Sequence, residues 1–151
     1  MSSEIIVLLI SMLPIVELRI GIPIALAVYN LPVWSAFVFS VIGNLIPVVF
    51  IMWFLGFLVK FLIHKIYFLN RFFSWLFEKT RKRHSAKFDR FRDLALIVLV
   101  AIPLPGTGAW TGALAAFVFG IPIKRAFPLI SIGVLIAGVI VTIITLGIVS
   151  L

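Results

Sequence analysis

The distribution of charge constrains this chain more than any other feature. No charged residue occurs in residues 20–59, 94–123 or 126–151. Hydrophobic residues make up 64% of the 151 positions, and the mean hydropathy is +1.30. A soluble domain of this size could not bury so much apolar surface, whereas a bilayer solvates it. We therefore predict one all-α integral membrane domain spanning residues 1–151.

The basic residues are concentrated in the middle of the chain. Residues 60–93 hold ten of the thirteen lysines and arginines, with three acidic residues. Basic segments that flank membrane spans stay on the cytoplasmic side, so this segment is predicted to be cytoplasmic. The membrane accounts for the charge, and nucleic-acid binding is not expected.

Part of this middle segment has a helical polar stripe. Its members recur at steps of four and three: Lys60, His64, Tyr67, Arg71, Ser74 and Glu78. Such a helix lies in the membrane surface or continues a span into the headgroups. Anionic lipid headgroups are the predicted partners of the basic residues.

The apolar stretches fall into two length classes. Residues 33–59 and 126–150 are long enough to cross a bilayer, which takes about 20 residues. Shorter stretches flank Pro14 on one side of the chain, and Pro103 and Pro105 on the other. Proline breaks a helix, so each pair of short stretches predicts a re-entrant hairpin with an irregular tip. The alternative is a kinked but continuous span.

The two halves, residues 4–59 and 94–151, read as copies of one unit joined by residues 60–93. The paired positions are Leu13 and Pro14 with Leu104 and Pro105, Gly21 with Gly112, Ala25 with Ala115, Pro32 with Pro122, and Gly43 with Gly133. With the middle segment cytoplasmic, the copies must be inverted and both termini must lie outside the cell membrane. Inverted repeats with broken helices are typical of secondary transporters.

Glu17 and Arg19 are the only charges between Ile5 and Val59. A charge at membrane depth is expensive unless it is paired or hydrated, so both are candidate transport residues. Arg19 could hold a phosphate or carboxylate through its planar fork, and Glu17 could exchange a proton or bind a cation. Alternatively, both are structural and tie the first tip to the other repeat. Two residues apart, they lie on different faces of a continuous helix, which disfavours direct pairing there.

The second tip, residues 102–112, offers backbone rather than charge. Thr107 and Thr111 add hydroxyls, and Trp110 adds a large aromatic face. Amides at the start of the return helix could bind an anion, or the glycines could only permit close helix packing. The predicted tip residues are Pro14, Gly21, Pro23, Pro103, Pro105, Gly106, Gly108 and Gly112, and Asn44 and Pro47 are candidates for lining the same cavity.

Residues 13–23 and 102–108 resemble the two signature stretches of the small multidrug export protein family. That family is similar to the DedA, or VTT-domain, superfamily. The resemblance implies two facing re-entrant hairpins and a transport role, and DedA-like members are linked to movement of lipids, including polyprenyl-phosphate carriers. Glu17 and Arg19 match the acidic and basic roles of the first motif. The second motif departs from DedA, because no arginine lies in residues 94–123.

We therefore expect a transporter or lipid translocase that moves a small or lipid-linked anionic substrate through a midplane cavity between the tips. Coupling to a proton or cation stays open. The alternatives are a non-transporting scaffold or assembly protein and a small-drug/proton antiporter, which would need four unbroken spans. We see no nucleophile–base pair or metal-ligand cluster, so an enzyme, a metal and a cofactor are not expected. Two spans make a thin wall for a cavity, which favours a homo-oligomer, most simply a dimer.

Overall fold

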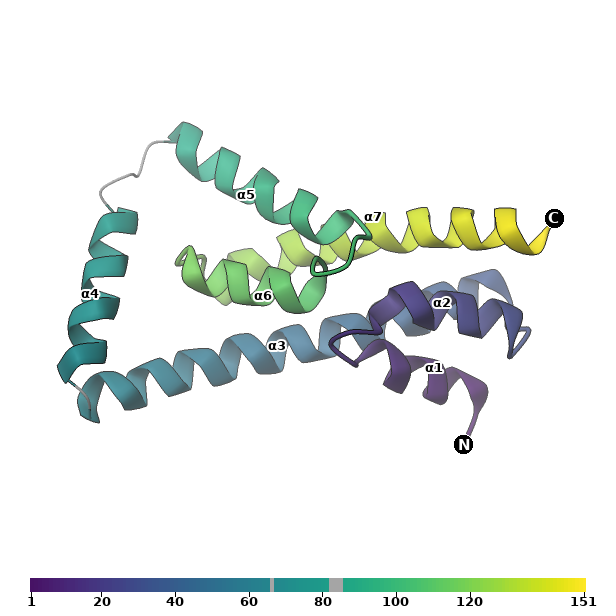
Figure 1. The fold of residues 1–151 in the computed structure, drawn as a ribbon, viewed down its shortest axis with the longest axis horizontal. Helices are drawn as coiled ribbons and strands as arrows, with labels where there is room; N and C mark the ends of the chain where they lie inside the picture. Colours follow the sequence, from purple (N-terminus) through teal and green to yellow (C-terminus); the bar gives the residue numbers. More distant parts are fainter. Residues whose placement is uncertain (66, 82–85) are drawn as a thin grey trace.

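A computed structural model describes residues 1–65, 67–81 and 86–151. Over these residues the chain is helical and contains no strand, as predicted (Figure 1). The helices are α1 (Ser3–Ser11), α2 (Glu17–Ala27), α3 (Val33–Lys65), α4 (Tyr67–Arg81), α5 (Ala86–Ala101), α6 (Ala109–Val118) and α7 (Ile123–Val149).

Two short helical hairpins meet in the middle of the molecule. The chain reverses direction at residues 12–16 (tip 1) and at residues 102–108 (tip 2), and the arms of each hairpin contact each other. Neither hairpin is therefore one kinked helix. Figure 1 shows the hairpins opening toward opposite ends of the molecule, with both chain termini at the same end.

The long helices α3 and α7 pack against each other and run in opposite directions (Figure 1). Among the described residues, 33–62 and 123–149 are long and apolar enough to cross a membrane. These ranges include the predicted span 33–59 and all but the last residue of the predicted span 126–150. Pro47 in α3 and Pro128 in α7 lie inside the helices without ending them, as membrane helices allow.

The polar stripe predicted over residues 60–78 does not lie on one helix, since the structure has two helices there. Residues 60–65 extend α3, and a separate amphipathic helix, α4, follows. Helix α5 begins at Ala86 rather than near 94, so its first two turns are polar. These turns make ion pairs: Arg92 Nη2 lies 3.5 Å from Asp89 Oδ1, and Asp93 pairs with Arg125 of α7. Residues 82–85 of the basic run lie outside the described residues.

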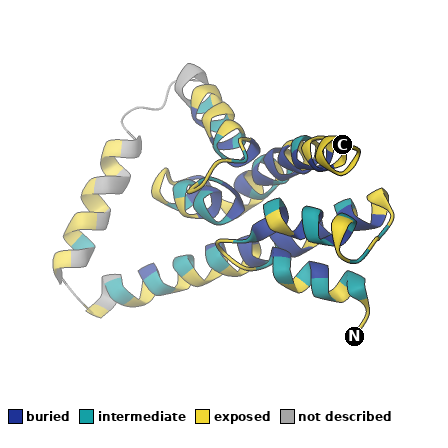
Figure 2. Ribbon diagram, turned by 45° about the vertical axis from the view of Figure 1, so that its right-hand side comes forward, coloured by how far each residue is buried: buried dark blue, intermediate teal, exposed yellow. Residues whose placement is uncertain are grey.

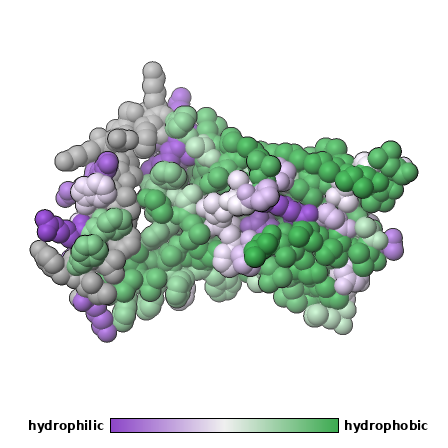
Figure 3. Space-filling view, in the orientation of Figure 1, coloured by the Kyte–Doolittle hydropathy of each residue, from purple (hydrophilic) through white to green (hydrophobic). Residues whose placement is uncertain are grey.

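The core forms where both hairpins press against α3 and α7. Figure 2 shows the buried residues on the facing sides of these helices. The core includes Leu18, Ile22, Val48, Leu96, Val100, Ile130 and Val134. The outer surfaces of α3 and α7 carry many exposed large apolar side chains, and Figure 3 shows a mainly hydrophobic face. Lipid is the solvent that such a surface requires.

Glycines set the spacing between each hairpin and its long helix. A Cβ at Gly43 would lie 2.3 Å from the Leu8 carbonyl oxygen of α1, and one at Gly133 would lie 2.6 Å from Val100 Cβ of α5. Such small residues let membrane helices approach closely. Each long helix therefore contacts the first arm of its own hairpin through a glycine.

We predict that Gly43→Ala and Gly133→Ala each lower the free energy of unfolding by about 1–3 kcal/mol, because the added methyl forces the helices apart. Thermal unfolding in detergent measures this. Gly56→Ala on α3 is the matched control, since no atom lies within 4 Å of its Cβ position. Equal losses at Gly43 and Gly56 would contradict the proposed packing role.

Candidate functional site

Arg19 of the first hairpin is bound by the backbone of tip 2. Its Nη1 donates a hydrogen bond to the Leu104 carbonyl oxygen, and its Nη2 donates to the Thr107 carbonyl oxygen. Nη2 also lies 2.9 Å from Thr107 Oγ1. The planar guanidinium carries five donors in a fixed fork and can bond several acceptors at once. A lysine ammonium, on a flexible stem, would hold these acceptors less firmly. The positive charge of one hairpin is thus met by the carbonyl dipoles of the other.

Glu17 makes the opposite contact with tip 2. Its side chain is buried, and its Oε1 accepts a hydrogen bond from the Trp110 backbone N–H at 3.4 Å. Trp110 is the second residue of α6, so the carboxylate lies at the positive end of that helix dipole. The amides predicted to bind an anion therefore bind an anion of the protein itself.

The backbone at the start of α2 brings the two charges together. Glu17 has a φ of +49°, a left-handed conformation that is unfavourable for a residue with a side chain. Glu17 is the first residue of α2 and has a non-helical φ, so Glu17 and Arg19 are not related as two residues of a regular helix. Arg19 Nη2 and Glu17 Oε2 lie 3.8 Å apart as a result. Strained backbone at such a site persists because its surroundings hold it.

The remaining predicted polar residues hold the tips in shape. The Trp110 indole N–H donates to the Met12 carbonyl oxygen at 3.2 Å, a second link between the hairpins. Thr107 Oγ1 lies 2.6 Å from the Ile102 carbonyl oxygen, which closes tip 2 on itself. Thr111 Oγ1 donates to the Gly106 carbonyl oxygen at 3.0 Å. Thr111 therefore acts within tip 2 and not across the junction.

The other predicted site residues fall into three places. Turn residues are Pro14 in tip 1 and Pro103, Pro105, Gly106 and Gly108 in tip 2, while Pro23 lies inside α2. Gly21 and Gly112 pack the arms of their hairpins, and Asn44 and Pro47 are buried in α3. Sequence reasoning missed the carbonyls of Met12 and Leu104, because every residue has a carbonyl and no side chain marks the ones that bind.

A groove with apolar walls leads to Arg19 from the end of the molecule where the termini lie. It has a volume of about 350 Å³ and runs between α2 and the second half of α7. Its lining residues are Arg19, Pro23, Ala27, Pro103, Val141, Ile144, Thr145, Ile148 and Val149. Figure 3 shows pale and purple atoms in the middle of the otherwise apolar face, where the tips meet.

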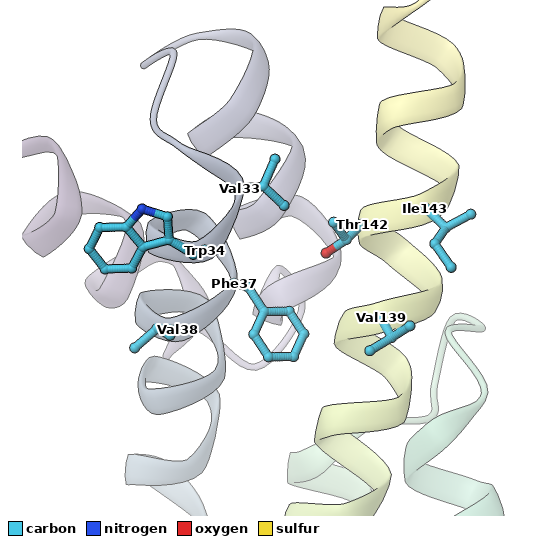
Figure 4. Close-up of a pocket in the computed structure, with 7 residues that line it drawn as sticks. All are labelled: Val33, Trp34, Phe37, Val38, Val139, Thr142 and Ile143. Atoms are coloured by element: carbon cyan, nitrogen blue, oxygen red, sulfur yellow. The ribbon is translucent and has the colours of Figure 1, made fainter.

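A second groove, of about 590 Å³, is apolar throughout. It lies between the start of α3 and the second half of α7. Figure 4 shows Phe37 and Thr142 between the helices and Trp34 turned away. The Thr142 hydroxyl donates to the Gly138 carbonyl oxygen of its own helix, so no polar group is presented to a ligand.

The described part of the chain contains no cluster of His, Cys, Asp or Glu side chains for a transition metal. No three His, Cys, Asp or Glu side chains gather there in a way that could hold an ion. We define the tip junction as Glu17, Arg19, Thr107, Trp110 and the tip 2 backbone.

One family model matches this chain. It is described as "Putative small multi-drug export protein", and it covers residues 17–140, more than half of the sequence. The match includes both charges of the tip junction, all of tip 2 and most of α7. No curated protein and no solved structure matches the chain.

Gly108 tests the geometry of the tip junction. A Cβ there would lie 2.2 Å from Glu17 Oε2, and the φ of +121° already requires glycine. Gly106 has a φ of +82° but open space around it. We predict that Gly108→Ala lowers Tm in detergent clearly more than Gly106→Ala, whose cost is backbone strain of about 1–2 kcal/mol. Similar losses would mean that Glu17 is not held against Gly108.

Proposed function

The chain belongs to the small multi-drug export protein family, and we propose that it is a membrane transporter for an anionic amphiphile that passes between the two hairpin tips. The family name indicates an exporter rather than an enzyme. The substrate class, the use of Arg19 and the path are our inference. A lipid-linked phosphate or carboxylate is the chemistry we favour.

The observation that carries the proposal is Arg19 at the inner end of the groove between α2 and α7. Apolar walls with one guanidinium suit a ligand that has an anionic head and an apolar body. The Arg19 side chain keeps 18% exposure although its carbonyl partners surround it. A guanidinium has five N–H donors, so an anion can bind without breaking every bond to tip 2.

The helix contacts support an inverted repeat. Exchanging α1 with α5, α2 with α6 and α3 with α7 maps the contacting helix pairs onto one another. For example, α2 contacts α7, and α3 contacts α6. The opposite directions of α3 and α7, and of the hairpin openings in Figure 1, are those of an inverted pair. We propose that both hairpins are re-entrant and that their tips meet near the membrane midplane.

The basic middle segment supports the orientation. We propose that α4 lies at the cytoplasmic surface of the cell membrane, where Lys60, Lys65 and Arg71 can reach anionic headgroups, and that both termini lie outside. The Arg19 groove then opens to the outer side. We also propose a dimer, because two long helices cannot enclose a path by themselves. The similarity to the DedA superfamily stays a prediction.

In the transport cycle, the contacts across the tip junction would be the closed state of the path. Passage requires the tips to part, which exposes the Glu17 carboxylate and the α6 amides. An anionic head that binds the remaining N–H groups of Arg19 then competes with the carbonyl oxygens of Leu104 and Thr107 and so favours parting. Glu17 would then be free to take up a proton or a cation, which is one route to coupling.

A scaffold is the second candidate, and the same contacts favour it. Glu17 and Arg19 both bind the opposite hairpin, so their role could end with folding. On this hypothesis, substitutions at these positions lower the yield of folded protein but leave binding per folded molecule unchanged. Measuring both quantities on the same samples separates the two functions.

We predict that Arg19→Gln lowers the affinity for a fluorescent anionic lipid by roughly 10–100-fold per folded molecule, because a hydrogen-bonded charge is lost. The same substitution should slow lipid flux in proteoliposomes. Arg19→Lys should restore only part of the binding, since one ammonium replaces a fork of donors. Lys124→Gln makes the same charge change on α7 outside the groove and should have no effect. Unchanged binding in Arg19→Gln would leave the scaffold as the better hypothesis.

Topology is directly testable, since the chain contains no cysteine. Single cysteines at Ser2 and Asn30, at the ends of the first hairpin, should react with an impermeant maleimide from outside the cell. Cysteines at Arg90 and Gly120, at the ends of the second hairpin, should react only after the cytoplasmic side is exposed. Labelling of Ser2 and Asn30 from opposite sides would instead support four continuous spans.

A further inference from the structure

Three buried oxygen atoms of the first hairpin unit stand apart from the tip junction. They are Ser11 Oγ, Ser40 Oγ and Asn44 Oδ1, and within the described part of the chain none has a hydrogen-bond partner. Ser11 and Ser40 are fully buried, and Asn44 is 2% exposed. Unpaired polar atoms in a membrane interior are strongly unfavourable, so their presence needs an explanation.

Ser11 and Ser40 lie where α1, α2 and α3 meet, and Asn44 follows Ser40 by one turn of α3. The Cβ position of Gly21 on α2 lies 2.1 Å from Ser11 Oγ and 3.2 Å from Ser40 Oγ. The Cβ position of Gly43 on α3 lies 3.0 Å from Ser11 Cβ. Ser40 and Asn44 are one turn apart on α3, so they lie on the same face. Gly21 of α2 thus lies against both Ser11 Oγ of α1 and Ser40 Oγ of α3.

Other hydroxyls in the long helices avoid this problem. Ser131 donates to the Phe127 carbonyl oxygen, Thr142 to that of Gly138 and Thr145 to that of Val141, each at 2.7 Å. This back-bonding to the preceding turn is the usual arrangement for a buried hydroxyl in a helix. Ser11 and Ser40 do not make it. Their oxygens face the interface between helices instead.

The second hairpin unit shows that the packing itself does not require oxygen. There the Cβ positions of Gly112 and Gly133 both lie against Val100, just as those of Gly21 and Gly43 lie against Ser11. Val100 is therefore the counterpart of Ser11. The residues 90 positions after Ser40 and Asn44 are Ile130 and Val134, and all three counterparts are buried. The same architecture is filled by apolar side chains in one unit and by oxygens in the other.

We propose that Ser11, Ser40 and Asn44 form a binding site for a small monovalent cation such as Na⁺. Two hydroxyls and an amide oxygen are the hard, neutral oxygen ligands that such ions prefer, and water can complete the coordination. None of the three side chains is charged, so the site suits a monovalent ion better than a divalent one, whose second charge would have no balancing ligand. Ser11 is the last residue of α1, where the helix dipole is negative and favours a cation.

Binding at this site is independent of the proposed function, whereas use of the cation to drive transport would rest on it. The three residues take no part in the tip junction and do not line the Arg19 groove. If the native chain binds anionic lipid but not Na⁺, the cation site alone is wrong. If the native chain binds Na⁺ but not anionic lipid, the transport proposal alone is wrong.

The test uses the full chain purified in detergent. We expect NaCl to raise Tm by roughly 3–6 °C over choline chloride at equal ionic strength when Na⁺ reaches about ten times its dissociation constant. Radiolabelled sodium should bind with the same concentration dependence. Asn44→Leu, which keeps the volume and removes the oxygen, should abolish both effects. Ser131→Ala, which removes a hydroxyl bonded within its own helix, should abolish neither.

A second variant covers the case in which Asn44→Leu does not fold. A triple variant copies the apolar set of the second unit, where these side chains are buried: Ser11→Val, Ser40→Ile and Asn44→Val. This variant should be folded, insensitive to Na⁺ and unable to bind radiolabelled sodium. If the native chain shows no difference between Na⁺ and choline, or if the triple variant keeps the difference, the site holds water or nothing, and the proposal is wrong.

Discussion

The structure depends on one requirement, which is that charge and free backbone groups in a membrane interior must satisfy each other. Proline interrupts both hairpins, so tip 2 presents carbonyls without helical partners and α6 begins with free amides. Arg19 supplies donors to the carbonyls, and Glu17 supplies an acceptor to an amide. Two arrangements that would each be unstable alone, a charged pair and an unwound tip, are stable together.

This exchange explains why the two hairpins have such different sequences. The first contributes side-chain charge, and the second contributes backbone dipoles with Thr107 and Trp110. Gly108 lets the two surfaces touch, because any side chain there would occupy the space of the Glu17 carboxylate. The contact is therefore asymmetric although the helix contacts on either side of it correspond.

Local features made much of the fold predictable from sequence. The positions of Pro14, Pro103 and Pro105 and the lengths of the apolar stretches predicted two short hairpins and two long helices. One predicted boundary was less accurate, because α5 begins at Ala86 rather than near residue 94, and its first turns make ion pairs with partners on other turns and helices. Glu17 and Arg19 were identifiable as unusual charges. Their partners were not, since backbone acceptors carry no sequence signal and the contact depends on how two distant tips meet.

Recognition through the backbone also changes what mutational scanning can reveal. Arg19 binds the carbonyl of Leu104, whose side chain points largely into open space with 56% exposure. Replacing that side chain leaves the carbonyl in place, so an alanine scan of tip 2 would pass over a principal contact of the junction. Tip 2 is defined by the path of its main chain rather than by the identity of most of its side chains. On the tip 2 side, a change to the main chain itself is needed to test this contact, such as a backbone ester that weakens the carbonyl acceptor or an insertion that shifts the turn.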